Sequence, residues 1–154
     1  MQKNKAPDTE MQVNAALEAR AERRQRMLPV DDDDDIRELR ARVLVLSDCH
    51  VAAAADGADA WQALNADTYD LLVTDHNMPN VSGVELLERL HAAPMALPAI
   101  MATGMFPEEE LNLRPWLQPF AALLQPYTPS QLLGTVHEVL SVADGANRHV
   151  GPPS

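Results

Sequence analysis

Cysteine is nearly absent from this sequence, because Cys49 is the single one in 154 residues. One cysteine excludes an intramolecular disulfide, so we expect a chain that works in the reducing cytoplasm. Aromatic residues make up only 4%, and a core must therefore consist mainly of aliphatic side chains, Met and Ala. No apolar run approaches the roughly 18–20 residues that a membrane helix needs, and the polar N-terminal residues lack a secretory signal pattern.

Lysine occurs only at Lys3 and Lys5, so the rest of the chain has none. The net charge is −11, and residues 31–154 carry six arginines against nineteen acidic residues. A domain of this charge repels phosphate backbones, which disfavours a nucleic-acid partner. The 154 residues, 46% of them apolar, suffice for one globular domain with a core.

The two ends of the chain lack the pattern of a folded core. Residues 1–26 are polar, and much of this stretch is rich in good helix formers, which predicts an N-terminal extension or linker of helical propensity. Residues 143–154 contain Gly, Asn and Pro, and this composition predicts a disordered tail. The predicted domain spans residues 27–142.

Strand and helix patterns alternate five times within the predicted domain. The expected strands span residues 27–30, 50–54, 70–75, 98–103 and 121–124. Helical patterns occupy 35–46 and 83–90, and others begin after Asp56-Gly57, near Pro107 and at Pro129. Short crossovers of this kind require a parallel sheet with helices on both faces. We expect a doubly wound, flavodoxin-like α/β fold with strand order 2-1-3-4-5.

Two of the expected helices carry specific signals. The segment Thr128-Pro-Ser-Gln131 is a capping box with proline at the first helical position, and it predicts a helix that starts at Pro129. In residues 35–46 the apolar side chains are spaced to form one buried face. That face consists of Ile36, Leu39, Val43 and Leu46.

Acidic residues follow the strands that this fold brings together. Asp31 and Asp32 follow the first strand, and Asp75 ends the third. In doubly wound sheets ligands bind at these carboxyl ends, where the strand order reverses. Three carboxylates in one crevice repel one another, and a hard divalent cation such as Mg²⁺ relieves that repulsion. A Mg²⁺-loaded carboxylate crevice suits phosphoryl transfer, in which an aspartate can be the nucleophile.

The segment Leu71-Leu-Val-Thr-Asp75-His-Asn-Met78-Pro79-Asn-Val-Ser-Gly83 strongly resembles the phosphoacceptor loop of bacterial response-regulator receiver domains. The resemblance covers residues 27–141. It includes the acidic pair before Ile36-Arg37, then Ala55-Asp56-Gly57, Thr103-Gly104 and Pro126-Tyr127-Thr128-Pro129. The resemblance implies a receiver of two-component signalling with the fold of the chemotaxis regulators.

The resemblance also implies a role for each matching residue. Asp75 would accept the phosphoryl group, and Thr103 would donate its hydroxyl to a phosphoryl oxygen. Mg²⁺ would be held by Asp31, Asp32, Asp75 and the backbone carbonyl of Asn77, with Asp32 as the direct ligand of the acidic pair. No other cofactor is implied.

The chain departs from the family pattern at two positions. The last strand ends in Gln125-Pro126 where receivers carry Lys-Pro, and Ala122 stands where an aromatic switch residue is usual. The resemblance implies a cis Gln125–Pro126 peptide bond. The register of the acidic pair stays open, because Asp32 and Asp33 are the alternative to Asp31 and Asp32. We therefore expect an intact metal and phosphoryl site, with altered residues for reporting phosphorylation.

Two functions from different classes follow from these features. The first is a cytoplasmic receiver that is phosphorylated on Asp75 by a histidine kinase or phosphotransfer protein and signals through a downstream protein or a homodimer. The second is a pseudo-receiver, an interaction module that works without phosphate, which Gln125 and Ala122 favour. A Mg²⁺-dependent phosphohydrolase is disfavoured, because the catalytic lysine and late acidic motif of such enzymes are missing. We therefore expect a signalling module, not an enzyme, with neither nucleic acid nor a membrane as partner.

Overall fold

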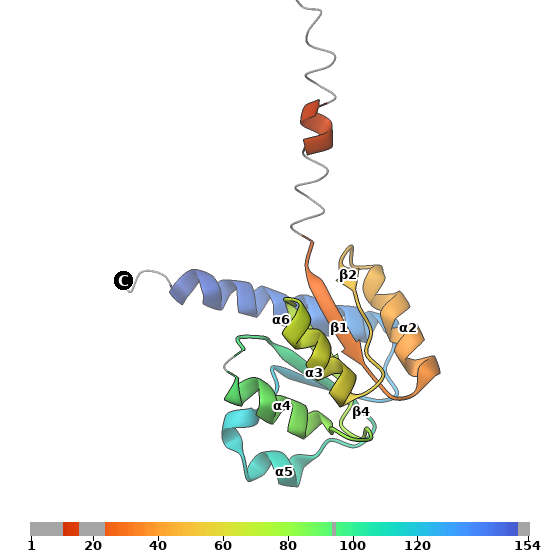
Figure 1. Cartoon of the computed structure of the whole chain (residues 1–154), viewed down its shortest axis with the longest axis vertical. Helices are drawn as coiled ribbons and strands as arrows, with labels where there is room; N and C mark the ends of the chain where they lie inside the picture. Colours follow the sequence, from red (N-terminus) through yellow and green to blue (C-terminus); the bar gives the residue numbers. More distant parts are fainter. Residues whose placement is uncertain (1–10, 16–23, 94, 151–154) are drawn as a thin grey trace, which may run out of the picture.

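The structure is a computed structural model that describes residues 11–15, 24–93 and 95–150 (Figure 1). Five parallel strands form one sheet in the order β2-β1-β3-β4-β5, which confirms the expected fold and strand order. The strands are β1 (Arg26–Val30), β2 (His50–Val51), β3 (Leu71–Thr74), β4 (Ala99–Thr103) and β5 (Ala121–Leu124). β2 is shorter than expected, and a single parallel bridge between Val30 and Ala54 continues its pairing with β1.

Helices cover both faces of the sheet. They are α2 (Asp34–Val45), α3 (Gly57–Ala66), α4 (Gly83–Ala92), α5 (Glu108–Asn112), the 3₁₀ turn η2 (Pro115–Leu117) and α6 (Pro129–Val150). Alternate residues of each strand point to opposite faces. Leu72 of β3 therefore packs in one core cluster with α3 and α4, whereas its neighbours Leu71 and Val73 pack with α2 and α6.

Local capping explains where several helices begin. The side chain of Ser82 accepts from the backbone N–H of Glu85, and the Glu85 carboxylate accepts from the N–H of Ser82, so α4 starts with a capping box. The predicted capping box of Thr128 and Gln131 is confirmed by the two reciprocal bonds at 2.8 and 3.1 Å. Each box satisfies backbone donors that the first turn of a helix leaves free.

The buried face of α2 differs from the expected one. Leu39 is 60% exposed and Leu46, just past the helix, is 74% exposed, whereas Arg40 and Leu44 are buried with Val43. The helix is turned toward Arg40, although arginine is a residue type that is normally solvated. The spacing rule failed here because burial of an arginine depends on partners from other segments, and spacing within the helix does not reveal those partners.

The predicted tail is also wrong for most of its length. α6 continues to Val150, so residues 143–150 are helical. Adding turns to a helix that is already formed costs little, and no proline follows Pro129 until Pro152. Residues 151–154 lie outside the described part of the chain. Of the predicted N-terminal extension the structure describes 11–15, which is helical, and 24–26, where β1 begins at Arg26.

None of the helices that the structure describes is long and apolar enough to cross a membrane.

Candidate functional site

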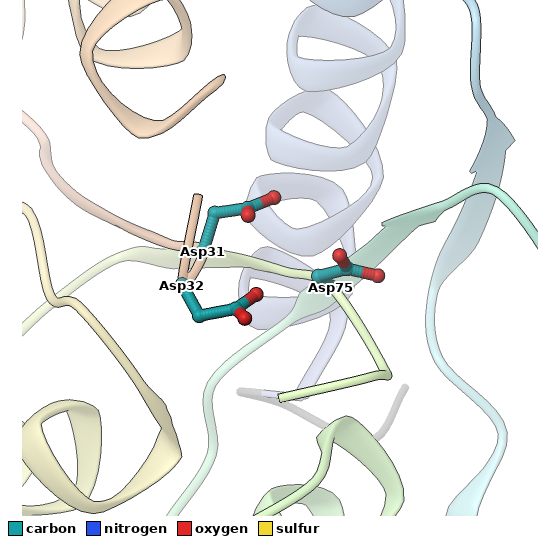
Figure 2. Close-up of side chains that lie close together, drawn as sticks. All are labelled: Asp31, Asp32 and Asp75. Carbon is teal, nitrogen blue, oxygen red and sulfur yellow. The ribbon is translucent and has the colours of Figure 1, made fainter. Parts of the chain in front are cut away.

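Three carboxylates meet at the carboxyl ends of β1 and β3. Val30 is paired in register with Thr74, so the residues that follow them, Asp31 and Asp75, leave the sheet side by side. Asp31, Asp32 and Asp75 each offer an oxygen, and these oxygens lie within 4.8 Å of one another. Figure 2 shows the three side chains gathered where the two strands end. The parallel register therefore brings together the acidic residues that the sequence pattern singled out.

The three carboxylates differ in burial and in their hydrogen bonds. Asp31 is buried, with 1% of its surface exposed, and its Oδ1 accepts the N–H of Asp33 at 2.9 Å. Asp75 is half-buried, and its Oδ1 accepts the N–H of His76 at 2.6 Å. Asp32 is exposed. The atoms that these three side chains can offer to a metal are all oxygens, the ligands that Mg²⁺ prefers, so the residues fit such an ion.

Burial raises the pKa of Asp31 above its usual value of 3.8, and the negative charges of Asp75 and Asp32 add to that increase. The N–H of Asp33 and the charge of Arg40 act in the opposite direction and stabilise the carboxylate. The cluster therefore holds a carboxylate whose charge is costly, and nearby cations lower that cost.

Asp33 has a different task from the three clustered carboxylates. Its Oδ1 accepts the N–H groups of Asp35 and Ile36 at 2.9 and 3.1 Å, so this side chain is the N-cap of α2. Among the described residues Asp31 and Asp32, and not Asp33, gather with Asp75. The geometry favours the first of the two registers for the acidic pair.

Close packing fixes the loop that follows Asp75. A Cβ added to Gly83 at the start of α4 would lie 2.5 Å from the carbonyl oxygen of Asp75 and 2.8 Å from the Cα of His76. Only glycine allows this approach. The His76 side chain is turned into the body of the protein, where Nδ1 accepts the N–H of Val84 at 3.4 Å. Asn77, two residues after Asp75, is exposed.

The ends of β4 and β5 form the remaining edge of the site. Thr103 is buried, and its hydroxyl donates to the carbonyl of Met105 at 3.5 Å. The N–H of Gln125 donates to the carbonyl of Thr103 at 2.9 Å. The Gln125–Pro126 bond is cis, as predicted. A Cβ on Gly104 would meet only the Gln125 side-chain oxygen, at 3.9 Å, so the space beside this glycine is open.

The response regulator receiver domain family matches residues 27–115. This chain belongs to that family. Receiver domains are signalling modules of two-component systems that bind Mg²⁺ at an acidic pocket, and this receiver has the corresponding cluster of aspartates.

Curated relatives and solved structures agree with this assignment. The sensor protein EvgS of Escherichia coli O157:H7 is 34% identical over 143 residues, which are 86% of this chain and 12% of that protein. A putative transcriptional regulator of Haloferax volcanii is 31% identical over 132 residues, 86% of this chain and 22% of that protein. This receiver therefore spans a small part of both relatives. A CheY-like receiver domain from Methanospirillum hungatei is 26% identical with a TM-score of 0.75, over 80% of this chain and 98% of that one.

One residue of this receiver's site escaped the sequence analysis. Arg40 approaches the cluster from α2, and its terminal nitrogen Nη2 lies 3.3 Å from Oδ2 of Asp31. Nη1 donates to the carbonyl of Val30 at 3.2 Å, and Nε donates to the hydroxyl of Tyr127 at 2.9 Å. The available signal was its position, four residues after Ile36 and three before Val43, which places an arginine in the apolar stripe of a helix.

Proposed function

We propose that this receiver accepts a phosphoryl group on Asp75 from a histidine kinase or a phosphotransfer protein, in a Mg²⁺-dependent reaction. The supporting observation is the cluster of Asp31, Asp32 and Asp75, whose oxygens lie within 4.8 Å of one another at the carboxyl ends of neighbouring strands. Asp75 follows β3, which pairs with β1 on one side and β4 on the other, and an N–H from His76 orients its carboxylate.

The proposed transfer needs one nucleophile and one leaving group. A carboxylate oxygen of Asp75 attacks the phosphorus, a P–O bond forms, and the P–N bond of the donor phosphohistidine breaks. The imidazole nitrogen keeps the electron pair and takes a proton from solvent. Thr103 would exchange its long bond to Met105, at 3.5 Å, for a bond to a phosphoryl oxygen.

The metal would be held by Asp31, Asp32, Asp75 and the backbone carbonyl of Asn77, with Asp32 as the direct ligand of the acidic pair. A bound Mg²⁺ supplies positive charge that offsets the negative charge of the transferring group. The exposed position of Asp32 and the half-buried position of Asp75 leave their carboxylates accessible to an ion and to a donor.

The proposed output is a contact with another protein in the cytoplasm, either an unidentified downstream protein or a second copy of this chain. One observation favours a second candidate function, an interaction module that works without phosphate. Gln125 occupies the edge where receivers carry a lysine, so the usual cation on β5 is missing. The labelling experiment below separates the two functions.

The test is incubation with the small phosphodonor phosphoramidate, followed by intact-mass measurement. We expect the wild type to gain the mass of one HPO₃ unit with Mg²⁺ and to remain unmodified with EDTA. Asp75→Asn should remain unmodified under both conditions. Asp70→Asn is the matched control, because Asp70 precedes β3 and lies at the opposite end of that strand. A folded wild type that binds Mg²⁺ but gains no mass would favour the phosphate-independent module.

A further inference from the structure

Arg40 is the largest fully buried side chain of the described residues, and none of its side-chain surface reaches solvent. Burying a guanidinium is costly unless charged and polar partners surround it. The carbonyl of Val30 and the hydroxyl of Tyr127 accept from two of its nitrogens. The third, Nη2, has no hydrogen-bond partner and faces the equally unpartnered Oδ2 of Asp31 at 3.3 Å. The partner of this buried charge is therefore the acidic cluster.

The other polar side chains near the cluster do not supply it with a positive charge. Arg37, one turn earlier on α2, donates to the backbone carbonyl of Asp31 and forms an ion pair with Asp34. Gln125, at the end of β5, carries no charge. Among the described residues, Arg40 makes the only ion pair with a member of the cluster.

The charge count of the crevice depends on this arginine. Asp31, Asp32 and Asp75 contribute three negative charges when ionised, and Arg40 reduces the sum to two. Two negative charges match one divalent cation, which leaves a crevice that an anionic phosphoryl group can enter without net repulsion. Without Arg40 and without a lysine at position 125, one carboxylate would remain unopposed.

We infer that Arg40 is a positioning residue that supplies, from α2, the cation that this receiver lacks at the end of β5. It acts through Asp31, because the guanidinium fixes Oδ2 while the N–H of Asp33 fixes Oδ1. Both oxygens of the buried carboxylate are thereby held in place, so Asp31 presents a fixed negative charge to the metal beside the accessible oxygens of Asp32 and Asp75. The inference rests on the proposed function, because the charge of Arg40 matters for entry of a phosphoryl group. Its effect on Mg²⁺ binding can be measured separately.

Position 125 borders the same cavity as Arg40. A cavity of about 510 Å³ lies between α2 and the start of α6. Arg40 lines it from one side, and Gln125 and Gly104 line it from the other. A lysine at position 125 would therefore bring its charge to the cavity that Arg40 lines.

The experiment is a double-mutant cycle that uses Arg40→Met, Gln125→Lys and the double variant. Calorimetric titrations measure the binding of Mg²⁺ alone and then of beryllium trifluoride in saturating Mg²⁺. Arg40→Met should bind Mg²⁺ about tenfold more tightly and beryllium trifluoride about tenfold more weakly, because one positive charge leaves the crevice. The added lysine of the double variant should return both affinities toward wild type. Arg42→Met, a change on the exposed side of the same helix, should alter neither affinity.

The opposite signs distinguish this role from a purely structural one, since a loosened fold would weaken both ligands. The inference is wrong if Arg40→Met lowers only thermal stability, or if the folded double variant keeps the affinities of Arg40→Met. If Arg40→Met does not fold, Gln125→Lys alone decides. A second cation should then weaken Mg²⁺ about tenfold with little gain for beryllium trifluoride, whereas a full tenfold gain would overturn the inference.

The Mg²⁺ titrations and the phosphoramidate labelling can fail independently of each other. The predicted changes in Mg²⁺ affinity among the variants, together with a wild type that takes no phosphoryl group from phosphoramidate, would support Arg40 as the cation. They would reject phosphorylation on Asp75. Phosphorylation of Asp75 combined with unchanged Mg²⁺ affinity in Arg40→Met would do the reverse.

Discussion

The hydroxyl of Tyr127 accepts a hydrogen bond from Nε of Arg40 at 2.9 Å. The same guanidinium lies 6.0 Å from the centre of the Tyr127 ring. Tyr127 belongs to the loop between β5 and α6, so this contact ties that loop to the middle of α2. It also satisfies a charged donor that water does not reach.

Tyr127→Phe should destabilise the fold because it removes the acceptor of the Arg40 Nε–H group. We expect the free energy of unfolding to fall by about 1.5–3 kcal/mol, the range for hydrogen bonds to charged groups. Urea unfolding measures the change. Tyr69→Phe is the matched control, since the Tyr69 ring lies 5.3 Å from the Arg26 guanidinium and its hydroxyl has no hydrogen-bond partner among the described residues. Equal effects of the two substitutions would contradict the importance of the Arg40 contact.

Gly83→Ala should destabilise the protein and displace the loop of Asp75. The new methyl group would lie 2.5 Å from the Asp75 carbonyl oxygen, a backbone atom that has to move. Overpacking of this kind costs about 1–3 kcal/mol, measured by thermal or urea unfolding. Gly134→Ala is the control, because its methyl group on α6 meets nothing within 4 Å and should stabilise the helix by about 0.5–1 kcal/mol. Stabilisation by both substitutions would refute the packing argument.

Asp32→Ala and Asp33→Ala should separate metal binding from helix capping. Loss of Asp32 should weaken Mg²⁺ binding at least tenfold, because an accessible ligand disappears. Loss of Asp33 should lower the free energy of unfolding by about 0.5–2 kcal/mol, the usual cost of an N-cap, and leave most of the Mg²⁺ affinity. Asp35→Ala, on an exposed residue of the same acidic run, should change neither property. The reverse pattern would favour the Asp32–Asp33 register.

Cys49 should react slowly in the folded protein. Burial raises the pKa of its thiol above the usual 9.0, the charge of Asp48 adds to this, and Sγ donates to the carbonyl of Leu44 at 3.1 Å. The thiolate is the reactive form, so alkylation by iodoacetamide at neutral pH should become fast only after unfolding. Because the folded state holds the proton more tightly, stability should fall as the pH rises above 9.0. Cys49→Ala should lack this component, and an equal decline in that variant would exclude the thiol as its cause.

Phosphorylation should change the conformation of β4 and β5 only weakly. A lysine ammonium makes a charge-assisted bond to a phosphoryl oxygen, worth about 1.5–3 kcal/mol, whereas the neutral Gln125 offers an ordinary amide bond. Arg40 bonds Tyr127 in the loop after β5, but its charge faces Asp31, so it does not replace a direct bond from the end of β5 to the phosphoryl group. We expect beryllium trifluoride to shift fewer NMR resonances of β4 and β5 in the wild type than in Gln125→Lys. Shifts as wide in the wild type would show that the lysine is dispensable for this coupling.

Local signals in the sequence account for the elements that were predicted correctly. Leu71, Leu72 and Val73 form a continuous apolar run, and such a run requires burial on both faces, as in the middle of a parallel sheet. The capping box of Thr128 defines the start of α6 through bonds within four residues. Asp75 was placed at the site because a buried strand leads directly to it. These features depend on neighbours along the chain, so the chain order reveals them.

The remaining features depend on contacts between distant segments. Asp31 and Arg40 are close in sequence, but the third partner, Tyr127, is far along the chain. Arg40 is buried only because Asp31, Val30 and Tyr127 surround it from two strand ends. The division of labour between Asp31 and Asp33 likewise follows from where α2 begins. By itself the sequence determined the strand order, the acidic cluster and the absence of a lysine at position 125. Only the tertiary structure decided which cation faces the cluster, because the pairing of a buried charge depends on groups that folding brings within a few ångströms.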